Sequence, residues 1–166
     1  MEIREATAGD WPAIWPFLRE IVAAGDTFAW PRDIGEERAR SFWMKEPPGR
    51  TVVAVGMAGD GSDVVLGTAN MNPNHMGPAS HIASASFMVA PEHAGRGVGR
   101  ALGEYVMEWA RAEGYRAMQF NAVVETNERA VHLWRSLGME VVATLKEGFL
   151  HPSKGYVGLH IMYRLL

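Results

Sequence analysis

Hydrophobic positions along the chain follow two periods, and their alternation predicts an α/β fold. Apolar residues at helical spacing predict amphipathic helices. The expected helices follow Asp10 and Asn127 and cover residues 35–45 and 98–113. Short apolar runs bounded by glycine, proline or asparagine predict strands over residues 2–6, 51–55, 64–71, 80–89, 117–123, 140–145 and 157–164. Residues 51–55 and 64–71 flank a turn-rich segment and are expected to form a hairpin.

The most distinctive stretch runs from a short strand through the bend AGRGVGR into a long helix. Gly95, Gly97 and Gly99 alternate there, so the backbone can adopt positive φ angles and approach a ligand without a Cβ in the way. The unpaired N–H groups of the first helical turn, together with Arg96 and Arg100, would attract an anion. A glycine that only caps a surface helix is the second interpretation, but a cap needs one glycine. The pattern therefore predicts a pyrophosphate site.

Asparagines mark a second region of interest. Asn70, Asn72 and Asn74 occupy alternate positions, so those on the strand would share a face. Residues 72–78 are predicted to be loop, where asparagine beside proline is ordinary turn chemistry, and this is the preferred interpretation. Asn121 interrupts an otherwise apolar strand and needs a partner, since an unpaired buried polar group costs about 1–3 kcal/mol. A bound ligand is one candidate for that partner.

The segment between the first two predicted helices has two open interpretations. Residues 25–31 contain the aromatic side chains Phe28 and Trp30 among polar and small residues. They can form a connector whose aromatic residues join the core, or a loop that covers a small-molecule substrate.

Composition narrows the class of protein. The 166 residues suit one domain, residues 1–166, and carry a net charge of −3 and no cysteine. We therefore expect no disulfide scaffold, thiolate nucleophile or metal, and no bulk binding of nucleic acid. The acidic N-terminal segment does not resemble a signal peptide, which favours the cytoplasm. Residues 64–91 lack Asp, Glu, Lys and Arg, but their asparagine, histidine and proline content argues against a membrane span.

Three blocks of the sequence resemble the GNAT superfamily of acetyl-CoA-dependent N-acetyltransferases. They are VAPEHAGRGVGRAL, FNAVVE and TNERAVHLWRSLGM, which together with the segment between them cover about a third of the chain. The resemblance implies a three-layer α+β arrangement. Its central sheet would be mixed and strongly twisted, with about seven strands, helices on both faces, and two central parallel strands that splay apart.

The resemblance also implies a binding site for acetyl-CoA between the splayed strands. The pantetheine arm would pair with the main chain at Phe87, Met88 and Val89, and Asn127 would contact it from the next helix. The pyrophosphate would lie on the bend formed by Gly95, Arg96, Gly97, Val98, Gly99 and Arg100. Two positions depart from the family pattern. Ala94 stands where an arginine or glutamine is usual, and Trp134 stands where many members have a tyrosine proposed to protonate the leaving thiolate.

Within the superfamily, the chain is similar to enzymes that acetylate small amino acids. FNAVVETN preceded by FMVAP resembles the azetidine-2-carboxylate acetyltransferases, and the GDTF loop resembles the phosphinothricin and methionine-sulfoximine acetyltransferases. The expected function is transfer of an acetyl group from acetyl-CoA to a primary or secondary amine of a small molecule, an amino acid or an analogue. A homodimer is one expected assembly. Candidate substrate-binding residues are Phe28, Trp30, Asn70, Asn72 and Asn121.

Candidate catalytic groups follow from the chemistry of amine attack on a thioester. A main-chain N–H near Met88 or Val89 would stabilise the oxyanion. The resemblance to the amino-acid acetyltransferases implies that Asn121 orients the acceptor amine or carboxylate. Glu125 and His81 are candidate bases for an amine whose free pKa is near 10. A thiol leaving group with a pKa near 8.5 makes a dedicated acid dispensable.

Two rival classes remain at this point. A Rossmann domain needs its glycine motif after the first strand and an acidic residue that ends the next strand, whereas the next strand here is AMQFNAV. The other rival is a module of the same fold that binds an acyl-CoA or a metabolite without turnover.

Overall fold

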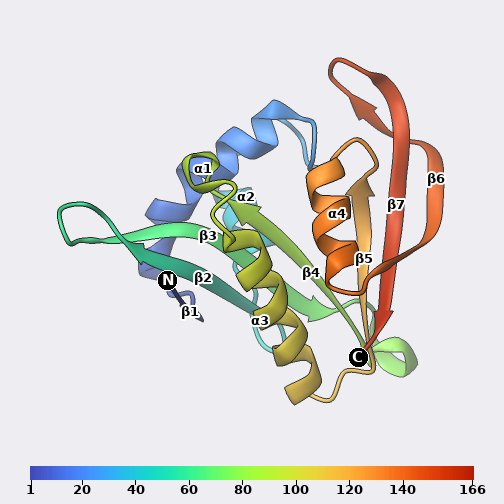
Figure 1. Ribbon diagram of the computed structural model, residues 1–166, viewed down its shortest axis with the longest axis horizontal. Helices are drawn as coiled ribbons and strands as arrows, with labels where there is room; N and C mark the ends of the chain where they lie inside the picture. Colours follow the sequence, from blue (N-terminus) through green and yellow to red (C-terminus); the bar gives the residue numbers. More distant parts are fainter.

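The computed structural model describes residues 1–166 and arranges them around a seven-stranded sheet with the order β1-β2-β3-β4-β5-β7-β6 (Figure 1). Neighbouring strands are antiparallel except β4 and β5, which are parallel. The expected mixed sheet with a central parallel pair is therefore confirmed. The strands are β1 (Glu2–Glu5), β2 (Arg50–Met57), β3 (Asp63–Pro73), β4 (Ile82–Val89), β5 (Ala117–Val124), β6 (Glu140–His151) and β7 (Gly155–Leu165).

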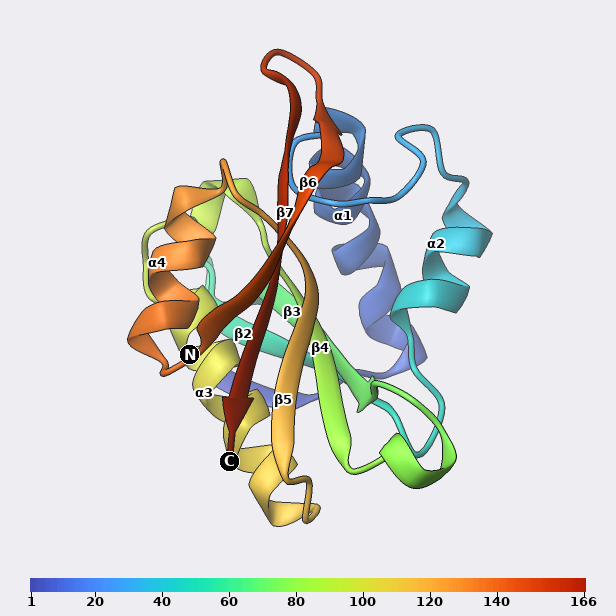
Figure 2. The ribbon, with the colours of Figure 1, turned by 90° about the vertical axis from the view of Figure 1, so that its right-hand side faces the viewer.

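Helices cover both faces of this sheet (Figure 2). α1 (Trp11–Ala24) and α2 (Glu36–Trp43) lie on one face, and α3 (Val98–Ala112) and α4 (Glu128–Ser136) lie on the other. Two hydrophobic clusters result, because each pair of helices buries its apolar stripe against its own side of the strands. α3 and α4 approach closely at Gly103, where a Cβ would lie 2.6 Å from Leu137 Cδ1. The three-layer arrangement implied by the resemblance is confirmed.

The two parallel strands part soon after they meet. β4 and β5 pair only over three residue positions, from Ile82 opposite Ala117 to Ser84 opposite Gln119. β5 then follows β7 with a register shift between Phe120 and Val123, which places one extra residue in β5. A bulge of this kind bends its strand, so β5 turns away from β4 while β4 stays paired with β3. The expected splay is confirmed, and the bulge is its local cause.

Some predicted boundaries are wrong. β3 continues to Pro73, so Asn72 belongs to a strand and not to the predicted loop. β6 continues to His151, well beyond residue 145. Lys146, Glu147 and Gly148 belong to residue types that are depleted in strands, but the structure accommodates them as an irregularity between Leu145 and Phe149, with Glu147 at a φ of 53°. These residues therefore form a bulge within β6 and do not end the strand.

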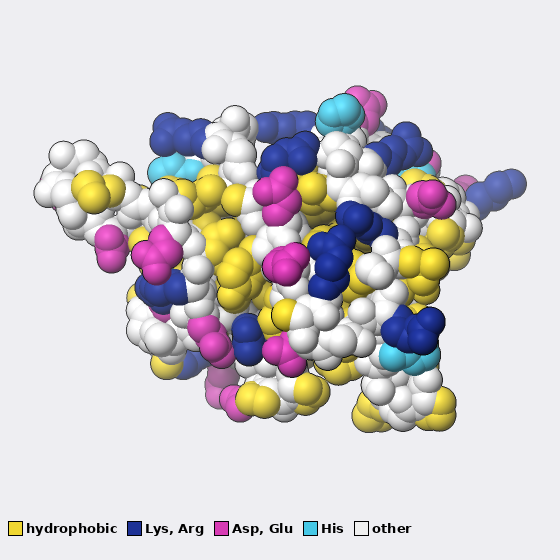
Figure 3. All heavy atoms as spheres, turned by 60° about the horizontal axis from the view of Figure 1, so that its bottom comes forward, with side chains coloured by type: hydrophobic (Ala, Val, Ile, Leu, Met, Phe, Trp, Pro, Cys, Tyr) yellow, Lys and Arg dark blue, Asp and Glu magenta, His cyan; other side chains and the backbone are white.

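Charged side chains of both signs lie close together on the surface. The face in Figure 3 shows acidic and basic groups interspersed, with hydrophobic side chains exposed between them. None of the helices is both long and apolar enough to cross a membrane.

Asp10 links the first strand to the first helix. Its carboxylate accepts two hydrogen bonds from Arg4, at 2.7 and 2.9 Å, and others from the N–H and hydroxyl of Thr7. Asp10 is 8% exposed. The hydrogen bonds from Arg4, followed by those from Thr7, outweigh the desolvation of the group and lower its pKa to about 2.

Replacing Asp10 with asparagine is expected to lower the free energy of unfolding at pH 7 by about 2 kcal/mol. The folded-state pKa lies below the unfolded value of 3.8, so this stabilisation is present above about pH 4 and is lost as the pH falls toward about 2. Urea denaturation at pH 7, 4 and 2.5 measures the effect. Asp60→Asn, in an exposed turn, is the control and should change little. Equal pH dependence in wild type and Asp10→Asn would contradict the expectation.

Candidate active site

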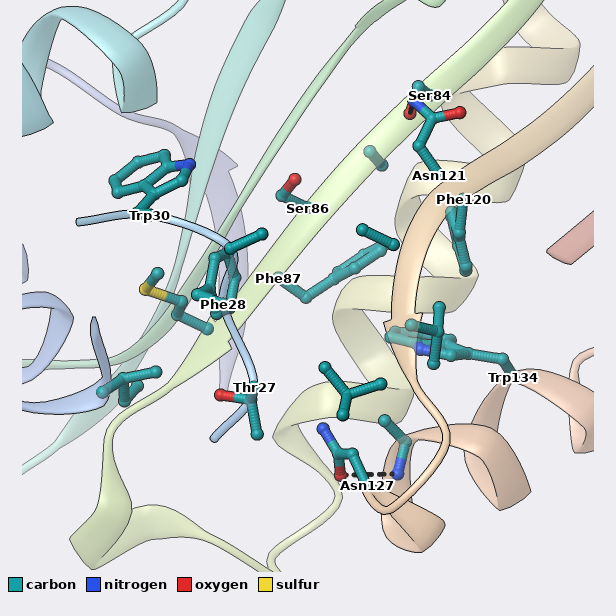
Figure 4. A pocket seen from close by; sticks show the side chains of 18 of the residues that line it. Thr27, Phe28, Trp30, Ser84, Ser86, Phe87, Phe120, Asn121, Asn127 and Trp134 are labelled. Carbon is teal, nitrogen blue, oxygen red and sulfur yellow. Dashed lines mark hydrogen bonds between the residues drawn. The ribbon is translucent and has the colours of Figure 1, made fainter. Parts of the chain in front are cut away.

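An apolar cavity of about 470 Å³ occupies the gap between β4 and β5. Its walls are residues 84–89 of β4, residues 120–124 of β5, and the loop residues 27–30. Ile21, Asn127, Ala130 and Trp134 complete the lining. Figure 4 shows β4 crossing the centre, with the loop on one side and β5 on the other. The bulge in β5 thus opens a space between two strands that remain part of one sheet.

The register of β4 determines which of its main-chain groups point toward this gap. Ala90 N–H donates to Leu66 O at 3.0 Å, and Asn74 N–H donates to Ile82 O at 2.8 Å. In an antiparallel pair such bonds recur at every second residue, so Met88 also faces β3, opposite Thr68. Phe87 and Val89 therefore direct their main-chain groups toward β5. Of the two N–H groups predicted as oxyanion donors, only that of Val89 is aimed at the cavity.

Aromatic side chains form the floor of the apolar cavity. Trp134 is 7% exposed, and its ring lies 4.5 Å from that of Phe87 and 4.9 Å from that of Phe120, measured between centroids. Figure 4 shows the Phe87 ring between the splayed strands and the Phe120 and Trp134 side chains beside β5. Trp134 has no group that can donate a proton to a thiolate. Its contribution is shape and burial, because Gly103 of α3 leaves room for the indole ring, with a Cβ there only 3.0 Å from Trp134 Cζ3.

Asn127 lies at the wide end of the gap, at the start of α4. Its side-chain oxygen accepts a hydrogen bond from Ala130 N–H at 3.3 Å, so it caps the helix as predicted (Figure 4). The cap occupies the oxygen and leaves the amide N–H groups of the side chain for other partners.

The glycine-rich bend follows the end of β4. Gly95 and Gly97 adopt φ angles of 79° and 80°, which only glycine tolerates easily, whereas Gly99 lies within α3 and needs no such freedom. The first intrahelical bond runs from Ala101 N–H to Gly97 O. The N–H groups of Val98, Gly99 and Arg100 precede it and have no partner within the helix.

The two arginines of the bend have different surroundings. Arg96 is exposed and takes part in no ion pair, but Arg100 donates to Ser136 Oγ at 2.7 Å and pairs with Glu104 at 3.6 Å. Arg100 is therefore directed toward the end of α4. Arg129 of α4, which the sequence did not single out, approaches the bend: a Cβ at Gly95 would lie 3.6 Å from its Nη2. Only tertiary packing brings Arg129 there.

The loop between α1 and α2 covers one side of the gap. Thr27, Phe28 and Trp30 line the apolar cavity, as Figure 4 shows. Phe28 and Trp30 also pack against buried Trp43, with centroids 6.2 and 6.1 Å apart. Phe28 and Trp30 thus join the core, as the connector interpretation predicted, and they also line the cavity. That the loop covers a substrate stays a prediction.

A second, polar cavity of about 390 Å³ adjoins the first on the α2 side of the sheet. Trp30, Ser84, Ala85, Ser86 and Asn121 line both cavities and form their common wall. The remaining lining residues are Ser41, Phe42, Lys45, Asn70, Asn72 and Asn74. The alternate asparagines thus lie on one side of the sheet, as their spacing predicted.

Asn121 lies in the bulge of β5 at the narrow end of the gap. Its side-chain amide donates to Asn74 Oδ1 at 2.6 Å and to Ser84 Oγ at 3.4 Å, and its oxygen accepts from Gln119 Nε2 at 2.9 Å. The bulge turns this side chain toward β4 and the polar cavity. Asn121 is exposed, so the expectation of a buried polar group is wrong, although its side chain does bond to a network of side chains from β4, β5 and the end of β3.

The two candidate bases lie outside both cavities. The carboxylate of Glu125 accepts a hydrogen bond from Gly158 N–H of β7, and Glu125 N–H donates to Gly158 O at 3.1 Å. His81 is exposed before β4, at the end of the strand away from the bend. Neither residue lines either of these two cavities. Lys45 is the one ionisable side chain that does, and no sequence signal marked it.

Similarity to known proteins agrees with this geometry. The family model described as the acetyltransferase (GNAT) family matches residues 15–139. A solved GCN5-related N-acetyltransferase from Kribbella flavida is 56% identical, with a TM-score of 0.92 over 99% of this chain and 97% of that chain. N-acetyltransferase aca1 of Schizosaccharomyces pombe is 34% identical over 98 residues, which are 58% of this chain and 47% of that protein. The matched part is thus about half the length of that relative.

A phosphinothricin acetyltransferase from Sinorhizobium meliloti, solved in complex with AcCoA, has a TM-score of 0.83 and 24% identity, over 99% of this chain and 88% of that chain. At this identity the likeness shows the fold alone. The splayed parallel strands, the glycine-rich bend and the family match over most of the sequence lead to one conclusion. The chain belongs to the acetyltransferase (GNAT) family.

Proposed function

We propose that this protein transfers the acetyl group of acetyl-CoA to the amine of a small molecule, an amino acid or an analogue. One observation carries the proposal: an apolar and a polar cavity share a wall where β4 and β5 part. A thiol-linked arm suits the first cavity and a small polar acceptor suits the second. Their common wall is where the two would meet, and holding two reactants together supplies much of the rate of such a reaction.

The residues present fit acetyl-CoA, which would supply an activated acyl thioester. The main chain of Phe87 and Val89 would pair with the amide-containing arm, and the side-chain amide of Asn127 would donate to it. The first-turn N–H groups of α3 would bind the pyrophosphate. Arg96 and Arg129 are the guanidinium groups placed beside the bend.

Arg129 also compensates for an unusual residue. Ala94 leaves the bend without the side chain that opens the family motif, yet Arg129 approaches the neighbouring Gly95 from α4. A cation is therefore present beside this part of the bend, and the anion site does not depend on residue 94.

Catalysis would depend on positioning and on the main chain. Val89 N–H would stabilise the charge that develops on the thioester oxygen, and Asn121 would orient the acceptor amine. The new N–C bond forms as the C–S bond breaks, the amine loses its proton, and the thiolate of CoA leaves. No Asp, Glu, His or Tyr lines either cavity, so the proton would pass to water in the polar cavity.

The placement of Glu125 leads to a prediction. Glu125→Gln is expected to leave kcat nearly unchanged and to lower the free energy of unfolding by about 1 kcal/mol, because the carboxylate is used in a hydrogen bond to β7. A general base would instead contribute about 10²–10⁴ to kcat. Steady-state kinetics and urea denaturation separate the two, with the exposed Glu140→Gln as control. A large loss of kcat in Glu125→Gln would contradict this prediction and indicate that Glu125 is the general base.

A binding module without turnover is the second candidate, favoured because no Asp, Glu, His or Tyr lines either cavity. Release of CoA thiol decides between them. Purified protein is incubated with acetyl-CoA and a panel of amino acids, proline analogues, polyamines and peptides. Thiol release above background with at least one amine is expected. Binding of acetyl-CoA without release would favour the module.

A further inference from the structure

The polar cavity contains one charge and no counter-charge. Lys45 is the only ionisable residue in its lining, and the other polar side chains there belong to asparagines and serines. Lys45 takes part in none of the four ion pairs of the structure. Lys45 is half-buried, and a cation that has lost part of its hydration favours a nearby anion.

The position of Lys45 is fixed by its backbone and by the start of its side chain. Its N–H donates to Thr51 Oγ1 at 2.9 Å, and that hydroxyl donates to Trp43 O at 2.9 Å. Gly49 packs against the side chain, since a Cβ at residue 49 would lie 2.9 Å from Lys45 Cβ. Burial lowers the pKa of the Lys45 ammonium group, and an anion beside it would oppose that shift.

Unpartnered amides lie in the same lining. Asn70 is 4% exposed and lines the cavity, and its side-chain amide is in none of the side-chain hydrogen bonds of the structure. The side-chain nitrogen of Asn74 is fully buried and also has no partner. Asn70 lies opposite Ser86 across the β3–β4 pair, and Asn72 lies opposite Ser84. These neutral side chains line the same cavity as Lys45 and carry no charge that would balance it.

We propose that the polar cavity binds a carboxylate of the acceptor, with Lys45 as its counter-ion and Asn70 as a hydrogen-bond donor. The inference rests on the proposed function and names its substrate class: amines that carry a carboxylate a few bonds from the nitrogen. The carboxylate lies beside Lys45, and the amine reaches Asn121 and Ser84 in the wall shared with the apolar cavity. Polyamines and other acceptors with a second cation are disfavoured, because Lys45 would repel them.

The test compares acceptors that differ only in this charge. L-Proline is paired with L-prolinamide, and L-leucine with L-leucinamide, at saturating acetyl-CoA. Wild type is expected to favour the acid of the preferred pair by about 10- to 100-fold in kcat/KM. Lys45→Met removes the charge and keeps the bulk, so it should abolish this preference and leave the KM of acetyl-CoA nearly unchanged. Lys45→Arg should retain the preference.

Lys154→Met, which removes an exposed lysine in the turn after β6, is the matched control and should behave as wild type. The inference is overturned if wild type uses acids and amides equally, or if Lys45→Met keeps the preference. If no amine is acetylated although acetyl-CoA binds, the proposed function fails. Calorimetric titration of the CoA-loaded protein with L-proline and L-leucine then tests the carboxylate site separately. The inference is overturned if neither amino acid binds, or if Lys45→Met binds them as tightly as wild type.

Discussion

Replacing Gly97 with glutamate is expected to raise the KM of acetyl-CoA by about 100-fold or more. The variant places a carboxylate where the first-turn N–H groups of α3 would receive the pyrophosphate, and each charge-assisted hydrogen bond lost there is worth about 1.5–3 kcal/mol. Like-charge repulsion adds to that loss. Nothing lies within 4 Å of a Cβ at Gly97, so the new side chain meets no steric barrier.

Backbone strain is the competing explanation, because Gly97 has a φ of 80°. Gly61 provides a matched control: its φ is 85°, a Cβ there also meets nothing within 4 Å, and it lies in the turn between β2 and β3. Gly61→Glu should lose similar stability and keep the KM. Acetyl-pantetheine, which lacks the pyrophosphate, should serve wild type and Gly97→Glu equally. An unchanged KM for acetyl-CoA in Gly97→Glu would show that the bend does not bind this molecule.

Asn121→Ala is expected to lower kcat/KM for the acceptor by about 10- to 100-fold. The substitution removes the group that would orient the amine and leaves Asn74 Oδ1 without its donor. Affinity for acetyl-CoA should remain nearly unchanged, because the main chain of β4 and the bend would bind that molecule. Initial rates with each substrate varied in turn separate the two effects.

Gln119→Ala is the control for Asn121. Gln119 donates to the Asn121 side chain from the same strand but lines neither cavity, so its loss should have a small effect on either substrate. Equal losses for acceptor and acetyl-CoA in Asn121→Ala would assign Asn121 a purely structural role in holding β5.

Local sequence signals predicted most of the elements. Apolar spacing predicted the four helices, and the glycine bend marked the junction of β4 and α3, because helix capping and turn chemistry act over a few residues. The bulge in β5 escaped detection, since one extra residue in a strand leaves no clear trace in an apolar run. That bulge determines the orientation of the Asn121 side chain. The strand could therefore be predicted from the sequence, but the direction of this side chain could not.

Charged residues at the candidate site were harder to assign than the strands. Arg100 belongs to the predicted motif but is bound to α4, whereas Arg129 and Lys45 belong to no motif and reach the site through packing between elements. Helical spacing places a residue on a face but does not specify which neighbouring helix it meets. The direction of the β4 main chain likewise required the register with β3.

The register of β4 also bears on how readily this chain can acquire new substrates. If the main chain at Phe87 and Val89 pairs with the cofactor arm, those contacts survive most substitutions, because every residue type except proline retains an N–H and a carbonyl. The polar cavity is built from side chains, and each of those can be exchanged without altering the strands. Variation in this protein should therefore change its choice of acceptor long before it changes its acetyl donor.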